Sequence, residues 1–521
     1  MRRLTPMVGR VTGRNSSSYA AGLFNFKIAP KEMFPYPCHK VDGDEAESLQ
    51  SLIRDVQKNS SIFTNLYGVR IGAEYGGMGV GYTAHALCYE EIGSKCGRDM
   101  LSLLRHSGVC TYLLSTVGDK HLKGKYLTAM SDGSIRMEWA VEEGFSSDLS
   151  MSLTKATPSD GKYLLTGRKI CLDAASATHF LISAKTLTQV TTEEGVTTSE
   201  RLSLFICAKD TPGLRVEKNV ITLGDAPSTE TVGAIGEGFK NVMITLFTGQ
   251  YLYAAALLGV MKRVQQTLND ISAVNESVQE LAASLACSVY AMEASIYALT
   301  AVMDIPAEDS LLECGLIGAF VQSTTARWLR EIEVLIPSNG QLGDCISCAR
   351  DIMGSTEHAD FLYSAAVCCG VEDYGLFFQN ASTLQMMQAR LLRSLGVYDR
   401  VPVKNVRNAS LIDAAVVKFG NAVEATFVRH GSHVQFQQLL LNRLGEAAAL
   451  LYAASAVASR ASMCLTKDLP SAALEEGLAS CFIVSAVGKI NALCDETCNT
   501  GKRADDIFKR VALDLCESVL Q

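Results

Sequence analysis

The sequence has no long basic stretch, no secretory leader with an apolar centre, and no uninterrupted apolar run of about 18 residues. Without clustered Lys and Arg side chains to neutralise phosphates, nucleic-acid binding is disfavoured at a net charge of -8. Without a long apolar run, we expect at most peripheral contact with a membrane. The 17 cysteines follow no repeating spacing, so a disulfide framework is not expected.

One C-x-x-C pair is formed by Cys345 and Cys348. Such a pair is either redox-active or supplies half of a zinc site. No second pair stands at zinc-ligand spacing, so we interpret both thiols as structural and predict no metal site.

Acidic residues are absent from positions 1–31, where arginine and serine are frequent. This composition is typical of a mitochondrial transit peptide, and the alternative is a disordered basic tail. We therefore expect residues 1–31 to be one of these two. The transit-peptide reading predicts a protein of the mitochondrial matrix or of the matrix face of the inner membrane. The basic residues are Arg2, Arg3, Arg10, Arg14, Lys27 and Lys31.

The spacing of apolar residues changes twice along the chain. Residues 42–117 have a helical pattern, interrupted at 76–81 by a glycine cluster without the setting of a nucleotide-binding loop, which we interpret as a turn. From about Ile135 short apolar runs alternate with Gly- and Pro-containing turns, as in β-strands. Helical spacing returns near Asn241. This segregated order predicts an α+β fold.

The chain beyond Pro402 is rich in Ala and Leu and predicts an additional helical unit. Leu440, Leu444 and Leu451 form a stripe at helical spacing, with charged residues between them. Such a stripe more often packs in a core than faces a membrane or a partner. We therefore assign these leucines to the interior.

Several short motifs, in one order and at fitting spacings, resemble those of acyl-CoA dehydrogenases. The resemblance extends from about Val69 to Met386, and the helical tail beyond is similar to the very-long-chain branch of the family. The matching segments are residues 71–79 (IGAEYGGMG, family P-x-E-x-G-G-x-G), 118–126 (GDKHLKGKY, family G-x-x-x-Q-K-x-x-Y), 140–144 (AVEEG, family A-L-T-E-P), 165–169 (LTGRK, family L-x-G-x-K) and 236–239 (GEGF, family G-x-G-F).

The resemblance implies the acyl-CoA dehydrogenase fold with a C-terminal extension. The N-terminal helical domain would span 40–134, the middle β-domain 135–240, the C-terminal four-helix bundle 241–398 and the helical extension 399–521. It also implies a homodimer, or a heterodimer with a paralogue.

The catalytic base of the family is missing from this sequence. The reaction needs a carboxylate that removes an α-proton while the flavin accepts a hydride. The residue at the family's base position is Gln379, and no Asp or Glu lies between Tyr374 and Tyr398. Some relatives carry the base on an earlier helix, and that position is Gly249 here. We therefore predict no catalytic residue, unless Glu372 or Asp373 acts as a relocated base.

The positions that the resemblance assigns to the flavin have also changed. Asp173 replaces a hydroxyl donor that meets the flavin ring, and the arginine-containing phosphate element has no counterpart near 271–278. Gly354 is followed by Ser355 where the family has a second glycine. We therefore expect no bound FAD and treat five positions as vestigial cofactor-binding positions. These are Glu142, Glu143, Ser147, Asp173 and Gly354.

Retained fold motifs without retained chemistry favour a pseudoenzyme that binds other proteins. Because one member of the very-long-chain branch assists assembly of respiratory complex I, the resemblance implies complex I subunits or assembly factors as partners. A permanent structural subunit is equally compatible. The alternatives are an active FAD-dependent acyl-CoA dehydrogenase of β-oxidation with a relocated base, and an acyl-CoA binder without turnover.

Overall fold

A computed structural model shows that the chain folds into two compact units, each made of segments that are separated in sequence. It describes residues 18–26, 28, 30–37, 47, 50–54, 66–95, 100–144, 149–192, 195–271, 276–305, 310–335, 340–380, 385, 387–388, 390–391 and 399–520. The first unit contains residues 40–260 and 339–356. The second contains 3–39, 261–338 and 357–521. The predicted segments 40–134 and 135–240 lie in the first unit and 399–521 in the second, whereas 241–398 is divided between the two.

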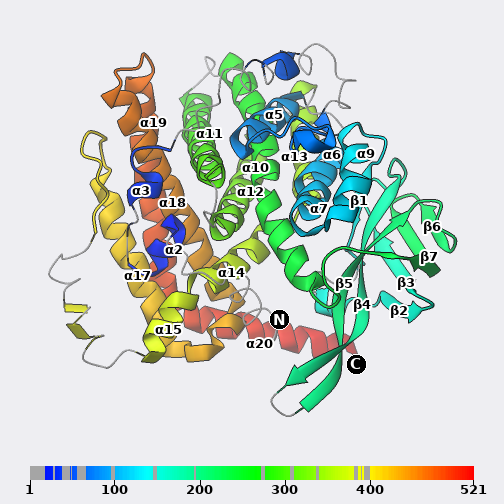
Figure 1. The fold of residues 1–521 in the computed structure, drawn as a ribbon. Coiled ribbons are helices and arrows are strands. Elements are labelled where there is room, and N and C mark those ends of the chain that lie inside the picture. The colour runs from blue at the N-terminus through cyan, green and yellow to red at the C-terminus, as the bar shows by residue number, and fades with distance from the viewer. Residues whose placement is uncertain are drawn as a thin grey trace. The chain divides into compact units, whose positions relative to one another are not determined.

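Helices and a β-sheet make up the first unit (Figure 1). Two helices approach most closely where Gly93 and Gly259 lie. A Cβ at Gly259 would lie 1.9 Å from the carbonyl oxygen of Glu90, and one at Gly93 would lie 2.1 Å from that of Ala256. Only glycine permits this approach. The helices are α5 (Tyr82–Lys95), α6 (Met100–Arg105), η3 (His106–Thr111), α7 (Tyr112–Val117), α8 (Lys120–Leu122), η4 (Lys123–Leu127), α9 (Thr128–Ser131), α13 (Gln341–Gly354) and the N-terminal part of α10 (Gly238–Ile271).

The sheet of the first unit has eight strands. Its order is β6-β7-β3-β2-β4-β5-β8, and β1 pairs with β4 in parallel. The predicted turn at 76–81 is present, with positive φ at Gly76 and Gly79. The strands are β1 (Met137–Ala140), β2 (Lys155–Ser159), β3 (Lys162–Ile170), β4 (His179–Thr192), β5 (Gly195–Ala208), β6 (Leu214–Glu217), β7 (Val220–Ser228) and β8 (Glu230–Thr231).

Apolar side chains from alternate strand positions form the core of the sheet domain. Phe180 and Ile182 on β4 and Phe205 on β5 are fully buried. Successive strand residues point to opposite faces, and the intervening Leu181 on β4 is buried too, so both faces of this strand are covered. All described strands lie between Met137 and Thr231, inside the predicted β-region 135–240.

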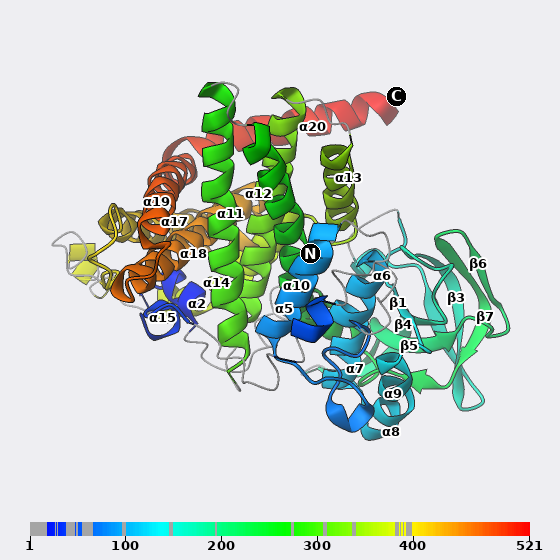
Figure 2. The ribbon, with the colours of Figure 1, turned by 90° about the horizontal axis from the view of Figure 1, so that it is seen from above.

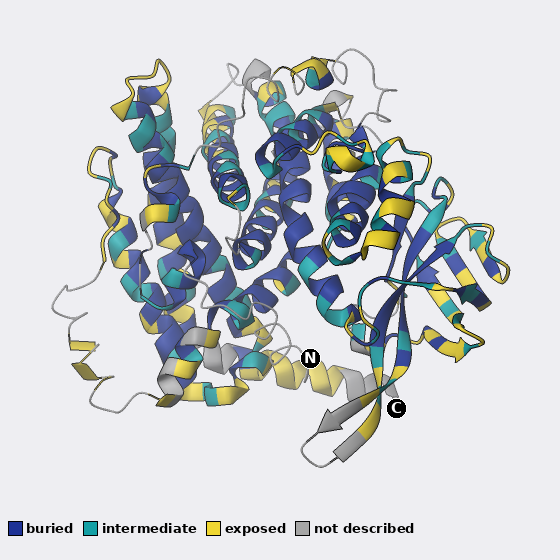
Figure 3. Cartoon of the chain, in the orientation of Figure 1, coloured by how far each residue is buried: buried dark blue, intermediate teal, exposed yellow. Residues whose placement is uncertain are grey.

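Long helices make up the second unit (Figure 2). The predicted leucine stripe is confirmed as core, because Leu440, Leu444 and Leu451 are buried. Figure 3 shows the helix that carries them, α18, as mostly buried. The helices are the C-terminal part of α10, α11 (Glu276–Met303), α12 (Leu311–Leu335), α14 (Ala359–Gly370), α15 (Glu372–Asn380), α17 (Ser410–His430), α18 (Gln438–Thr466), α19 (Ala472–Asp495) and α20 (Gly501–Leu520).

A short N-terminal helix, α2 (Tyr19–Phe24), belongs to the core of the second unit. Tyr19, Leu23 and Phe24 are at most 1% exposed. The Tyr19 hydroxyl donates to Ser455 Oγ at 2.7 Å. Another short helix, α3 (Pro30–Met33), follows. The expectation that the whole of 1–31 is a tail or leader is therefore wrong for residues 18–24, because they form part of the folded unit.

Among the residues that the structure describes, four helices are long and apolar enough to cross a membrane by length and composition alone. The apolar windows of the first three are 94%, 72% and 78% buried inside the protein, which accounts for their composition as core packing. The fourth window is 44% buried. A search for uninterrupted apolar runs overlooks these helices because small polar residues are interspersed. They are Gly238–Leu268, Glu276–Met303, Gln438–Thr466 and Ala472–Cys498.

Candidate functional site

The predicted flavin-facing positions of the first unit lie beside two buried polar clusters. Glu142 and Glu143 follow β1, and Asp173 follows β3. Ser147 lies outside the described residues. Gly354 is exposed at the end of α13. The two glutamates are therefore neighbours in the segment after β1, but each belongs to a different cluster.

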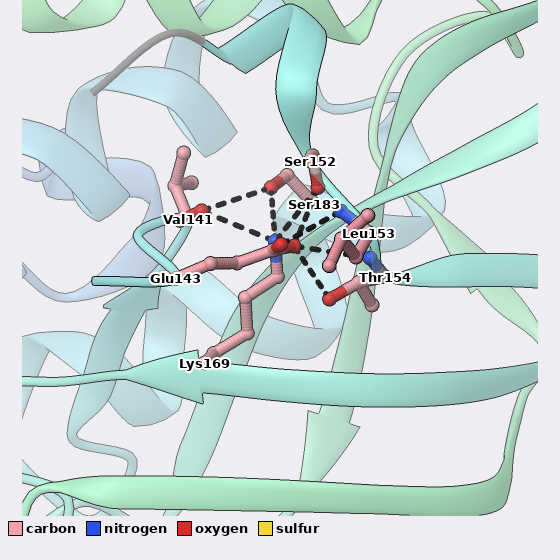
Figure 4. Close-up of polar contacts among 7 residues, drawn as sticks. All are labelled: Val141, Glu143, Ser152, Leu153, Thr154, Lys169 and Ser183. Atoms are coloured by element: carbon pink, nitrogen blue, oxygen red, sulfur yellow. Dashed lines mark hydrogen bonds and ion pairs between the residues drawn. The ribbon is translucent and has the colours of Figure 1, made fainter. Parts of the chain in front are cut away.

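The first cluster surrounds the ammonium group of Lys169, whose side chain is fully buried on β3 (Figure 4). Its Nζ lies 2.8 Å from Glu143 Oε1. It also donates to the carbonyl oxygen of Val141 at 3.1 Å and to Ser183 Oγ at 3.0 Å. Ser152 Oγ completes the shell at 3.4 Å. A buried ammonium is thus matched by one carboxylate and neutral acceptors, as a charge removed from water requires.

Glu143 is held by four further hydrogen bonds. Leu153 N donates to Oε2 at 2.7 Å, and Oε1 accepts from Thr154 N at 3.1 Å, Thr154 Oγ1 at 2.7 Å and Ser152 Oγ at 2.5 Å. Burial alone would raise the pKa of Glu143, but these donors and Lys169 lower it to about 2. Burial lowers the pKa of Lys169, and Glu143 opposes that change. Glu143 is therefore a permanently ionised structural anion.

The second cluster centres on Arg105 at the end of α6. Its Nη2 lies 3.0 Å from Glu142 Oε1, with the Arg105 side chain 5% exposed and that of Glu142 52% exposed. Arg105 Nε is buried without a hydrogen-bond partner among the described residues. Glu142 is thus anchored at one oxygen and open to solvent on its other side.

Two more titratable groups lie next to Arg105. Burial raises the pKa of Glu138 to about 7, although Arg105 lowers it. Glu138 Oε1 accepts from Leu172 N at 3.3 Å. His106 Nδ1 accepts from Met137 N at 3.2 Å, and burial lowers the pKa of this imidazole to about 4. Glu138 is therefore a carboxyl poised near neutrality, but its side chain is buried in the interior.

Asp173 also bonds within its own turn. It accepts from Ser176 N at 3.3 Å and from the Ser176 hydroxyl. This is the local hydrogen-bonding pattern by which aspartate stabilises turns. All three described carboxylates at the predicted flavin positions 142, 143 and 173 thus interact with donors of the protein itself.

The two base positions contain no described carboxylate. A Cβ at Gly249 would lie 2.9 Å from the carbonyl oxygen of Gly108, so no side chain fits there without a shift of backbone. Gln379 lies on α15, but its side chain and that of Asp373 are outside the described residues. Glu372 is exposed at the start of the same helix.

Gln250, the neighbour of Gly249, is 1% exposed and exchanges hydrogen bonds with Thr356. Its Nε2 donates to Thr356 Oγ1 at 3.0 Å, and Thr356 Oγ1 lies 3.2 Å from Gln250 Oε1. The pair joins α10 to the turn that follows α13. The side chain next to the alternative base position therefore serves packing within the first unit.

Sequence reasoning identified Lys169 as a family match but missed its partner, and it missed Arg105 and Glu138 entirely. Arg105 stands in the apolar run of residues 100–114, and Glu138 interrupts the apolar strand β1. A lone charge inside an apolar element is the signal that could have revealed both, because buried charges require partners. Among the described residues, no group of three or more His, Cys, Asp or Glu side chains could hold a metal ion.

Two family models match separate parts of the chain. The acyl-CoA dehydrogenase N-terminal domain matches residues 52–134, and the ACAD9/ACADV C-terminal domain matches residues 405–519. These matches fall within the predicted N-terminal domain 40–134 and extension 399–521.

Relatives and solved structures agree with these matches. Mitochondrial very long-chain specific acyl-CoA dehydrogenase of Rattus norvegicus is 25% identical over 550 residues, covering 91% of this chain and 83% of the relative. Mitochondrial isovaleryl-CoA dehydrogenase of Oryza sativa subsp. japonica is 30% identical over 214 residues, 38% of this chain and 51% of the relative.

Solved structures share the fold. An acyl-CoA dehydrogenase complexed with FAD from Bacillus anthracis matches with TM-score 0.71 and 18% identity, covering 94% of this chain and 87% of that one. Butyryl-CoA dehydrogenase from Megasphaera elsdenii matches with TM-score 0.52 and 15% identity, covering 70% and 96%. The predicted fold class is confirmed. The chain belongs to the acyl-CoA dehydrogenase family and carries a C-terminal domain of the ACAD9/ACADV type.

Proposed function

We propose that this chain is a catalytically inactive family member that acts in mitochondria as a structural subunit or assembly factor of respiratory complex I. The observation that carries the loss of catalysis is the state of the predicted flavin positions. Glu142 and Asp173 are carboxylates bound by donors of the protein, whereas the family motifs have a threonine at 142 and, at 173, a hydroxyl residue that meets the flavin.

These residues do not fit FAD. A carboxylate offers only acceptors, and a negative charge beside an electron-rich ring or a pyrophosphate is repulsive. Glu143 and Lys169 match the glutamate of the family's A-L-T-E-P and the lysine of its L-x-G-x-K, so the changes that bear on FAD are Glu142 and Asp173. We therefore propose that the chain does not bind FAD tightly and that no redox step takes place on it.

The base positions support the same proposal. A glutamine amide at Gln379 cannot take up an α-proton at neutral pH, and Gly249 has no space for a side chain. Glu138 has a pKa of about 7 but is buried and bonded to Leu172 N. Catalysis would require Glu372 or Asp373 to replace the base from another position on α15.

The cellular role rests on the relatives. Because the similar enzymes are named as mitochondrial, we place this protein in mitochondria, in the matrix or at the matrix face of the inner membrane. A C-terminal domain of the ACAD9/ACADV type supports complex I as the partner, by analogy with the branch member that assists its assembly. Since residues 18–24 belong to the fold, we place the end of any cleaved leader before Ser18.

The test is native purification of the protein from mitochondria, with its absorbance spectrum recorded and its partners identified by mass spectrometry. A catalytically intact acyl-CoA dehydrogenase purified in parallel is the flavin-positive control. We expect a flavin-free protein that migrates with complex I subunits or assembly intermediates. Stoichiometric flavin that bleaches on addition of an acyl-CoA would refute the loss of catalysis.

Rescue of depleted cells separates scaffolding from chemistry. Gln379→Ala and Glu372→Gln should each restore assembled complex I as well as the unchanged chain does, because the proposed assembly role does not depend on catalysis. Loss of rescue by Glu372→Gln, with normal protein levels, would instead favour an active enzyme with a relocated base. Normal complex I in depleted cells would refute the assembly role.

A further inference from the structure

The second unit contains a cavity of about 490 Å³ that is lined by residues of α11, α12, α14, α18 and α19. Figure 1 labels these helices. Sites for small ligands are typically clefts of roughly 300–1,000 Å³. All of its lining residues belong to the second unit, so it is separate from the clusters around Lys169 and Arg105. Neither the family resemblance nor the proposed function uses this cavity.

Apolar side chains and one buried donor form much of its wall. Phe320 and Phe482 pack edge to face with ring centroids 6.2 Å apart, and Leu450 lies beside them in the lining. Trp328 lines the same cavity and is 3% exposed. Its indole N–H has no hydrogen-bond partner among the described residues.

The charges of the lining favour an anion. Arg327 lies 3.6 Å from Glu331, and Lys489 pairs with Glu446. Arg330 is exposed, its Nε donates to the carbonyl oxygen of Ala326, and it forms no ion pair with any of the described residues. The lining therefore carries three cations and two carboxylates, a surplus of one positive charge. Arginine is well suited to carboxylates because its planar fork donates two parallel hydrogen bonds.

We propose that this cavity binds a small amphipathic carboxylate. Its apolar body would lie against Phe320, Phe482 and Leu450, and its charge would be balanced by Arg330. The ligand class follows from the pairing of an apolar wall with one surplus cation.

The chain has two tryptophans, which provides a direct test. Trp139 lies on β1 in the first unit, so Trp139→Phe leaves Trp328 as the sole fluorophore, located in the cavity. This variant is titrated with decanoate, with 4-phenylbutyrate, and with decyltrimethylammonium as the control of opposite charge. We expect saturable changes of Trp328 emission with the carboxylates and none with the cation. The two carboxylates distinguish an aliphatic from an aromatic ligand body.

Matched charge reversals identify the site. Arg330→Glu should weaken carboxylate binding at least about tenfold, since a charge-assisted hydrogen bond contributes about 1.5–3 kcal/mol. Arg215→Glu, the same charge change at an exposed position of β6, should leave binding unchanged. Both residues are exposed, so both variants should fold.

A second readout uses the exposed thiol of Cys481, which lines the same cavity. Bound decanoate should slow its alkylation by iodoacetamide, followed by mass spectrometry, while Cys498 outside the cavity should react at an unchanged rate. Equal responses to the carboxylates and the cation, or equal affinities of the two arginine variants, would overturn the proposal.

Discussion

Replacing Glu143 by alanine should destabilise the protein more than replacing Lys169 by methionine, although the two side chains form one ion pair. Without Glu143, the fully buried ammonium of Lys169 keeps only neutral acceptors, namely the Val141 carbonyl and the Ser152 and Ser183 hydroxyls. An uncompensated buried charge of this kind costs about 3–5 kcal/mol.

Removal of Lys169 leaves a better-satisfied partner. Glu143 keeps donors from Leu153 N, Thr154 N, Thr154 Oγ1 and Ser152 Oγ. We expect Lys169→Met to cost about 1–3 kcal/mol, the loss of one charged hydrogen bond. The double variant Glu143→Leu with Lys169→Met should be more stable than Glu143→Ala alone, because no buried charge is left without its partner.

The pH dependence of stability provides a second way to measure the contribution of Glu143. Displacement of the Glu143 pKa from its ordinary 4.5 to about 2 corresponds to about 3 kcal/mol of stability. Because the folded-state pKa is lowered, this contribution is present above pH 4.5 and is lost as the pH falls towards 2. The lowered pKa of Lys169 has the opposite effect, since protonating this buried amine opposes folding at neutral pH. The loss of unfolding free energy that Glu143→Ala causes, relative to the unchanged chain, should therefore become smaller as the pH is raised.

Urea denaturation of a Trp328→Phe background measures these differences, because Trp139 on β1 then reports unfolding of the first unit alone. The free energies of unfolding of the variants are compared at pH 7, and only variants with equal m-values are included. A cost of Glu143→Ala below about 1 kcal/mol, or a larger cost for Lys169→Met, would refute the assignment of Glu143 as the structural partner of a buried charge.

Three further changes test other parts of the fold. Glu138, whose pKa is raised to about 7, contributes stability below pH 4.5 that is lost as the pH rises through 7. In urea titrations, the free energy of unfolding of Glu138→Gln relative to that of the unchanged chain should therefore rise by up to about 3 kcal/mol between pH 5 and pH 8. Gly259→Ala should lower the unfolding free energy by about 1–3 kcal/mol, because its methyl group would overlap the Glu90 carbonyl, and no change in thermal unfolding would contradict this. Deletion of residues 1–17 should leave the midpoint of urea unfolding unchanged. Deletion of residues 1–31 also removes the buried helix α2, so it should abolish soluble expression or lower that midpoint strongly. Equal stability of the two truncated proteins would show that α2 is dispensable.

The fold could be predicted because its signals are local and repeated. The change from helical to strand spacing near Ile135, and back near Asn241, follows from the alternation of buried and exposed faces in each element. The leucine stripe Leu440, Leu444 and Leu451 was correctly assigned to the core for the same reason. Positive φ at Gly76 and Gly79 explains why a glycine cluster there forms a turn.

The contacts of the candidate site could not be predicted, because they join residues distant in sequence. Lys169 meets Glu143 across 26 residues, and Arg105 meets Glu142 across 37. Sequence position alone presented both glutamates as charges facing a cofactor. Only the three-dimensional arrangement reveals the cations that they bind.

The boundary of the predicted leader at residue 31 failed for a related reason. Composition remains basic and acid-free through residues 18–31, but the burial of α2 depends on helices encoded hundreds of residues later. Tyr19 contacts Ser455, and Ala20 N donates to Glu313 at 2.9 Å. Composition measures what a segment contains and not what covers it.

The dispersed assembly of the second unit sets an order on the maturation of the chain. Ser459 Oγ donates to the Met33 carbonyl oxygen at 2.5 Å, across 426 residues, so the N-terminal helices obtain their partners only after nearly the whole polypeptide has emerged from a ribosome or a translocation pore. Most of the first unit lies between these two segments and comes from one continuous stretch, 40–260. The sheet of the first unit can therefore form before α18 is available to complete the second unit. During that interval the apolar faces of α2, α11 and α12 lack their α18 partner, because contacts this distant in sequence form late.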